Sequence, residues 1–137
     1  MAQYMLMVYE EEVEPAERAE RERELPLFVH LHRTLREAGL LVAVKALRSP
    51  ETATSVRVRA GEMEITDGPF AVTKEVLAGY YILECADLDE ALKVAARIPA
   101  AGWGTIEVRP VAPTDEWVNW ADRVGVELSD EDLRDLV

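Results

Sequence analysis

Runs of hydrophobic residues predict the strands of this chain. Residues 4–9 are apolar at every position, which is typical of a strand covered on both faces. A second strand of this kind is predicted over 79–85, with Tyr80 and Ile82 on one face and Tyr81, Leu83 and Cys85 on the other. Two further strands are predicted over 40–47 and 105–111, so the pattern indicates a sheet with an extensive apolar centre.

Helical signals stand between these strands. Pro15 suits the first turn of a helix, residues 16–24 are rich in Glu and Arg, and Pro26 is expected to interrupt or restart this helix. An apolar stripe then runs over 27–38 and ends at Gly39, which suits the left-handed position after a helix. Asp87 predicts the capped start of another helix that ends before Pro99.

A β-hairpin is predicted over 54–66, around a two-residue turn at Ala60 and Gly61. The turn fixes the register, which is expected to pair Arg59 with Glu62, Val58 with Met63, Arg57 with Glu64 and Val56 with Ile65. Apolar pairs then share one face and opposite charges share the other, so a cross-strand charge ladder would explain the two arginines.

The order of elements predicts an α+β fold. Strand, helix, strands, strand, helix and strand follow one another, as in the ferredoxin-like βαββαβ unit, here with an inserted hairpin. Both helices would cover one face of the antiparallel sheet. Because monomers avoid a large exposed apolar patch, the second apolar face of the strands predicts a homodimer formed through the sheet.

Composition indicates one globular domain. The chain has 137 residues, of which 49% are hydrophobic and 31% charged. The net charge of −12 argues against binding to bulk nucleic acid or to anionic membrane surfaces. No apolar run approaches the roughly 20 residues that span a bilayer. The single Cys85 cannot form an internal disulfide, so we expect a cytoplasmic protein.

Residues 66–75, with the sequence Thr-Asp-Gly-Pro-Phe-Ala-Val-Thr-Lys-Glu, form the most distinctive segment. A turn would explain it, because Asp bonds nearby backbone amides, Gly permits positive φ and Pro fixes the next φ. Thr73 would then cap a short helical turn through Leu77. Alternatively, the turn aims Asp67 into a cleft at the mouth of a barrel, with Lys74 close by.

This segment resembles the signature of the DGPF-type, YCII-related proteins. Further stretches match the family's pattern in order: residues 52–57, 79–81, 87–91, 98–99 and 106–111. The resemblance covers about residues 4–111 and implies a dimeric α+β barrel built from two ferredoxin-like units. We accordingly divide the chain into a YCII-related domain, 1–112, and an acidic helical extension, 113–137.

The resemblance bears on function only broadly. The wider fold group includes enzymes acting on small ring compounds such as lactones and chlorinated aromatics, and some DGPF-type proteins are associated with sigma factors of the extracytoplasmic-function type. A His–Asp pair is discussed for YCII-related proteins. Here Phe28 occupies the histidine's place in the first helix, whereas Asp67 matches the acidic partner.

The first functional hypothesis is acid–base chemistry on a small organic molecule in a dimer cleft. Asp67 would act as the base, and Lys74 would hold a substrate carboxylate or stabilise an enolate-like charge. A cleft walled by Phe70, Tyr80 and Tyr81 would raise the pKa of such a carboxylate. The competing hypothesis is a non-catalytic ligand sensor or protein-interaction module linked to sigma-factor-dependent transcription.

Other polar residues leave alternatives open. Glu107 and Arg109 are expected on the sheet face opposite Ile106 and Val108, where they either pair at the dimer interface or line the pocket. His30 and His32 form no metal constellation, because two positions apart places them on different sides of a helix. No phosphate-cradling glycine loop or Rossmann fingerprint is present, so no cofactor is predicted.

The two acidic segments hold most of the net charge. Residues 10–24 carry eight acids and three bases, and residues 115–135 carry eight acids and two bases. They are either solvated helices or docking elements for a basic partner. Trp117 and Trp120 would share one face of the predicted C-terminal helix, packing on the chain's own body, on a partner subunit or on a different protein.

Overall fold

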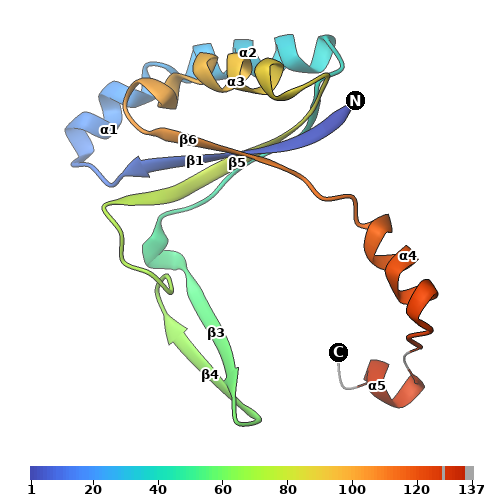
Figure 1. Ribbon diagram of the computed structural model, residues 1–137. Helices are drawn as coiled ribbons and strands as arrows, with labels where there is room; N and C mark the ends of the chain where they lie inside the picture. Colours follow the sequence, from blue (N-terminus) through green and yellow to red (C-terminus); the bar gives the residue numbers. More distant parts are fainter. Residues whose placement is uncertain (128, 135–137) are drawn as a thin grey trace.

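A computed structural model describes residues 1–127 and 129–134 of the chain. Its centre is a four-stranded antiparallel sheet in the order β2-β5-β1-β6 (Figure 1). The strands are β1 (Ala2–Glu11), β2 (Leu41–Ala46), β5 (Glu75–Cys85) and β6 (Thr105–Pro110). Helices α2 (Leu25–Glu37) and α3 (Leu88–Arg97) cover one face of this sheet. The predicted ferredoxin-like α+β fold is therefore confirmed.

The core lies between the sheet and this helical layer. Every second residue of β1 and β5 enters it, because side chains alternate across a strand. The most deeply buried large side chains are Leu6, Leu83, Ile98 and Cys85. Leu31 and Leu35 of α2 and Val94 of α3 are buried against them. The predicted division of β5 is confirmed, with Tyr81, Leu83 and Cys85 on the buried face.

Prolines, glycines and a capping aspartate set the helix boundaries. Helix α1 (Pro15–Glu22) begins at its proline, and α2 begins afresh just before Pro26. Gly39 has φ +74° and follows the end of α2, as predicted. Asp87 accepts a hydrogen bond from the backbone N–H of Glu90 (2.9 Å), which caps α3. Short 3-10 helices occupy Pro50–Thr52 and Pro99–Gly102.

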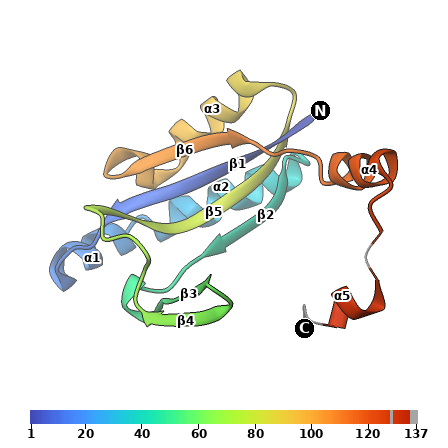
Figure 2. The same cartoon turned by 60° about the horizontal axis from the view of Figure 1, so that its bottom comes forward.

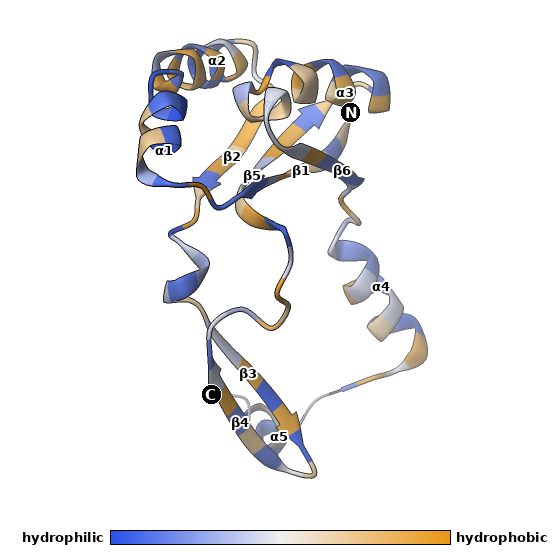
Figure 3. Ribbon diagram, turned by 90° about the vertical axis from the view of Figure 1, so that its left-hand side faces the viewer, coloured by the Kyte–Doolittle hydropathy of each residue, from blue (hydrophilic) through white to orange (hydrophobic). Residues whose placement is uncertain are grey.

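The inserted hairpin forms a separate two-stranded sheet of β3 (Thr54–Arg59) and β4 (Glu62–Asp67). Its predicted register is confirmed at all four predicted pairs. Ala60 and Gly61 both have positive φ, at 51° and 77°, as a primed two-residue turn requires. The hairpin projects away from the helical layer and shows alternating hydrophilic and hydrophobic residues along its strands (Figure 3).

The segment between the hairpin and β5 differs from one prediction. A short helical turn capped by Thr73 was expected through Leu77, but β5 already begins at Glu75 and runs antiparallel to β1 from Glu11 onward. Pairing with β1 therefore overrides the local capping signal. The Thr73 hydroxyl instead donates to the backbone carbonyl of Glu75.

The sheet face opposite the helices, here called the open face, carries Met5, Met7, Tyr80 and Ile82 from the two central strands. These four side chains are only partly exposed in a single chain. The described part of the chain places no helix over them (Figure 1). Both faces of the central strands are therefore apolar, as the sequence predicts.

Beyond β6 the chain extends to α4 (Asp115–Val124) and α5 (Asp130–Arg134), which stand apart from the sheet (Figure 2). Gly125 ends α4 in the left-handed conformation, with φ +69°. Residues 128 and 135–137 of the predicted extension lie outside the described residues. Across the described ranges, no helix is long and apolar enough to cross a membrane.

Candidate functional site

A pocket of about 400 Å³ opens at one end of the core, between the helices and the sheet. Strands β1, β2 and β5 supply its floor, and α1 and α2 supply one wall. Its apolar lining includes Val8, Leu25, Phe28, Val44 and Trp103. A mostly apolar cavity with a few polar groups is the usual form of a small-molecule site.

Two polar side chains meet inside this pocket. The Nε2 atom of His32, on α2, shares a hydrogen bond of 2.6 Å with the hydroxyl group of Tyr81, on β5. The two rings meet edge to face, with centroids 5.2 Å apart. Only 3% of Tyr81 is exposed, whereas His32 is partly exposed, so the hydrogen bond is partly buried at the edge of the pocket.

Burial keeps both members of the pair neutral near pH 7. It lowers the pKa of His32, with a smaller contribution from the positive charge of Arg36. Burial also raises the pKa of Tyr81 to about 12. When Nε2–H of His32 donates to the Tyr81 oxygen, the Nδ1 atom is left as a base and the phenol hydrogen is left as a donor, so the pair offers both groups to a ligand.

Aromatic side chains enclose this pair. The ring of Phe28 lies one helical turn before His32, with ring centroids 6.3 Å apart. Trp103, which follows the 3-10 helix after α3, closes the pocket at the level of α1. Its indole N–H donates to the carboxylate of Glu24 (2.8 Å), and the guanidinium of Arg21 stacks 4.2 Å from its ring centroid.

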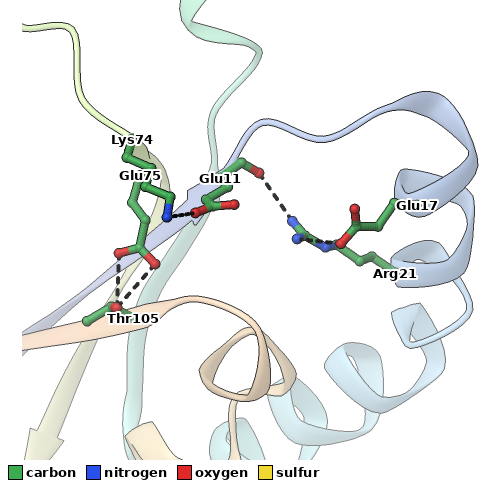
Figure 4. Close-up of polar contacts among 6 residues, drawn as sticks. All are labelled: Glu11, Glu17, Arg21, Lys74, Glu75 and Thr105. Carbon is green, nitrogen blue, oxygen red and sulfur yellow. Dashed lines mark hydrogen bonds and ion pairs between the residues drawn. The ribbon is translucent and has the colours of Figure 1, made fainter.

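The mouth of the pocket carries charges of both signs. Glu10 has a raised pKa because it is partly buried, although the nearby charges of Arg21 and Arg18 act in the opposite direction. Arg21 is held in place by the backbone carbonyl of Glu11 and the carboxylate of Glu17 (Figure 4). Arg18 also lines the pocket, so an anionic group could be bound at this entrance.

The residues predicted from sequence fall in three places. Tyr81 lines the pocket with its side chain, and Tyr80 is part of the lining at the neighbouring position of β5, although its side chain lies on the open face. Asp67 is the last residue of β4 and Phe70 lies in the following loop, where 81% of Phe70 is exposed. The Lys74 side chain is 85% exposed and forms an ion pair with Glu11, with 3.2 Å between Nζ and a carboxylate oxygen (Figure 4). Asp67, Phe70 and Lys74 therefore lie outside this pocket.

Glu107 and Arg109 lie on the open face, where they pair with Met7 and Met5 of β1. Their side chains form an ion pair of 3.4 Å along β6. The arrangement agrees with the predicted placement opposite Ile106 and Val108. Within a single chain the pair lies apart from the pocket on the helical side.

Metal binding finds little support in this arrangement. Among the described residues, no three His, Cys, Asp or Glu side chains lie close enough together to hold a metal ion. The thiol of Cys85 is fully buried, and burial together with the charge of Glu90 raises its pKa. A thiol in such surroundings is a poor nucleophile.

Sequence reasoning did not assign His32 to the site. The histidine follows Phe28 by four positions and precedes Gly39 by two turns, so it lies beside the apolar stripe of α2. Tyr81 was correctly placed on one face of its strand, but sequence periodicity does not reveal which helix covers that face. The contact between α2 and β5 becomes visible only in the folded chain.

Comparisons with known proteins agree with the fold. The family model described as the YCII-related domain matches residues 2–115. An uncharacterized protein of Rhizobium meliloti (strain 1021) is 47% identical over 78 residues, which span 56% of this chain and 63% of that protein. The match thus covers less than two thirds of the relative's length.

Proposed function

The chain belongs to the YCII-related domain family, and we propose that it binds a small organic molecule in the pocket between its helices and sheet. The observation that carries this proposal is the partly buried hydrogen bond between His32 and Tyr81 inside a mostly apolar cavity. Polar pairs that merely stabilise a fold are seldom left lining an open cavity, because a cavity deprives them of packing.

The lining indicates the class of ligand. Phe28, Val44 and Trp103 offer flat and aliphatic surfaces to a ring or a short apolar chain. Arg18 at the entrance suits a carboxylate or another anionic group. A carbonyl or hydroxyl group on the ligand would lie at the His32–Tyr81 pair, so we expect a small ring-containing or short-chain organic acid.

The chemistry of the pair is proton transfer. In the tautomer in which Nε2–H of His32 donates to the Tyr81 oxygen, Nδ1 is the basic nitrogen; it would take a proton from a ligand carbon or oxygen and return it to another atom or to a leaving group. The Tyr81 hydroxyl, which accepts from Nε2–H of His32 in this tautomer, keeps its own hydrogen and would donate it to a ligand oxygen that gains negative charge during this step. Isomerisation and elimination reactions need only these two actions and no cofactor.

The roles predicted for Asp67 and Lys74 stay predictions. Neither residue lines the pocket of a single chain, so the chemistry proposed here does not use them. We also propose that the chain forms a homodimer through the open face of its sheet, since Met5, Met7, Tyr80 and Ile82 offer an apolar surface there. A second copy would bring further residues to that face.

A binding screen tests the proposed site. Small carboxylic acids, lactones and phenols are titrated into the wild-type protein and into His32→Gln and Tyr81→Phe, with binding read by thermal shift and calorimetry. His30→Gln serves as the matched control, because His30 is exposed on the same helix. We expect at least tenfold weaker binding for the two pocket variants only. Equal affinity in all four proteins would place the ligand elsewhere.

A further inference from the structure

Two parts of the chain project from the sheet on the side away from the helices (Figures 1 and 3). The hairpin arm is the pair β3 and β4, and the helical arm is α4. The space in front of the open face lies between them (Figure 1). The two arms and the open face are therefore three surfaces that one molecule seated on the sheet could touch.

The hairpin arm has one apolar and one charged face. The cross-strand pairs Val56–Ile65 and Val58–Met63 form the apolar face, and each of these side chains is 58 to 66% exposed. Arg57 and Arg59 pair with Glu64 and Glu62 on the other face. Alternation of this kind is typical of a strand pair with one face covered and one in water.

A two-stranded hairpin is marginally stable in water unless its apolar face packs on something. At the foot of this hairpin two hydrogen bonds join its own ends: the Ser55 hydroxyl donates to the carbonyl of Gly68 (2.8 Å), and the Gly68 N–H donates to the carbonyl of Ala53 (2.7 Å). The apolar pairs lie further along the arm. The apolar face of the hairpin therefore needs a surface to pack on, and the four-stranded sheet of the same chain does not provide it.

The helical arm has the same character. Trp117 and Trp120 lie three residues apart on one face of α4 and are 67% and 54% exposed, with Val124 one turn further on. Tryptophan side chains carry large apolar areas that are normally buried on a partner or on the chain itself. The prediction that they pack on the chain's own body is therefore not met in a single copy.

We propose that both arms pack on a second copy of this chain, seated against the open face. The inference rests on the homodimer proposed above and extends it to the arms. A twofold dimer is self-complementary, so each copy would offer its arms and receive those of its partner. The four apolar side chains of the hairpin arm and the two tryptophans of the helical arm are each more than half exposed, so both arms offer apolar area to such a partner.

The charge pattern favours this occupant over a basic foreign protein. The charged residues of the hairpin arm balance one another, because Arg57 and Arg59 pair in register with Glu64 and Glu62. The centre of the open face is apolar, and the charged groups around it are of both signs: the Glu107–Arg109 pair of β6, Lys45 of β2 and Glu84 of β5. Two apolar surfaces can pack without charge complementarity, whereas a basic partner would need an acidic surface opposite it.

The test measures dimer dissociation in the full-length chain. Val58→Lys and Ile65→Lys place a charge on the apolar face of the hairpin arm, and Thr66→Lys places it on the opposite face of the same strand pair. For the helical arm, Trp117→Ala is compared with Asp122→Asn, which lies five positions further along on the opposite face of α4. Sedimentation velocity is expected to show at least tenfold weaker association for the arm variants and less than twofold change for both controls.

The remaining outcomes separate this inference from the proposals above. The wild-type chain is measured over a 100-fold range of concentration up to about 100 μM. If it is monomeric throughout, both the homodimer and the packing of the arms on a second copy are overturned. If Met7→Lys on the open face dissociates the dimer while the arm variants associate as the wild type does, the packing of the arms on the second copy is overturned and the homodimer is not. Ligand binding in the pocket is measured in parallel and is expected to survive in every arm variant.

Hydrogen exchange of the wild-type protein avoids the risk that a variant misfolds. Backbone amides of β3 and β4 are expected to be protected when the chain is dimeric, because the packed hairpin then opens only with the dimer. Dilution below the dissociation constant should release that protection, while amides of β1 and β5 stay protected. Protection of the hairpin that does not change with concentration would overturn the proposal.

Discussion

The Nε2 atom of His32 lies 2.6 Å from the Tyr81 hydroxyl oxygen, although 49 positions of chain separate the two residues. The bond joins the middle of α2 to the central strand β5 at the floor of the pocket. It therefore serves the fold and the proposed site at the same time. Substitutions at either residue are therefore expected to change both the stability of the fold and the affinity for a ligand.

Removal of the Tyr81 hydroxyl should weaken the fold. In Tyr81→Phe the ring keeps its place in the core, but the Nε2 atom of His32 loses its partner. We expect the free energy of unfolding to fall by about 1–2 kcal/mol, the usual cost of leaving such a group unsatisfied. Urea denaturation measures this loss. Tyr80→Phe on the opposite face of β5 is the control and should change stability by less than about 0.5 kcal/mol.

The stability of the protein should fall in mild acid because of His32. Its pKa is lower in the folded chain than the ordinary value of 6.5, mainly because the ring is buried. The unfolded chain therefore binds more protons, so stability is full above pH 6.5 and is lost as the pH falls through the lowered pKa.

Glu10 titrates with the opposite sign, since its raised pKa favours the folded state at low pH. The difference between the wild type and His32→Gln isolates the histidine from this contribution. Denaturation at pH 7.5, 6.5, 5.5 and 5.0 should show that this difference shrinks with falling pH. A constant difference across the series would mean that His32 titrates normally in the folded protein.

Gly79 sits where β5 approaches β2 most closely. A Cβ atom at this position would lie 2.5 Å from the carbonyl oxygen of Lys45 and 3.2 Å from the Cα atom of Ala46. Gly79→Ala must push β2 away from the sheet, and we expect a loss of about 1–3 kcal/mol. Gly102→Ala is the control, because nothing lies within 4 Å of a Cβ atom there. Equal thermal midpoints for the two variants would contradict this account.

The sequence allowed most of the fold to be predicted, because its signals are local. The hairpin register followed from one turn, since Ala60 and Gly61 both adopt the positive φ that such a turn requires. The break before Pro26 and the end of a helix at Gly39 rest on equally local backbone limits. Thr73 was misjudged because pairing of Glu75 with β1 is a long-range effect.

The site was harder to predict for the same reason. His32 and Tyr81 belong to patterns that were each interpreted correctly, a helical stripe and an alternating strand. Which residue of the stripe meets which residue of the strand depends on how α2 crosses the sheet. The motif around Asp67 drew attention because its residue types are unusual, whereas the His32–Tyr81 pair is unusual only in its surroundings.

Asp67→Asn distinguishes the motif from the pocket. Asp67 is exposed at the end of β4, paired in register with Thr54, and the next residue, Gly68, has φ +97°. Because Asn tolerates the same turn, we expect the fold to be kept and the affinity for the pocket ligand to stay within twofold. Asp67→Ala should lower the thermal midpoint slightly if the carboxylate supports the turn.

Calorimetry and turnover on these two variants separate the hypotheses. If a ligand of the pocket binds both with wild-type affinity while His32→Gln loses it, the proton-transfer site lies between the helices and the sheet. If Asp67→Asn instead abolishes turnover with unchanged stability, unchanged association and unchanged binding, the carboxylate acts on the substrate from a second copy of the chain. Lys74→Ala then becomes the next variant, because its ion pair with Glu11 is exposed and should cost less than about 1 kcal/mol to lose.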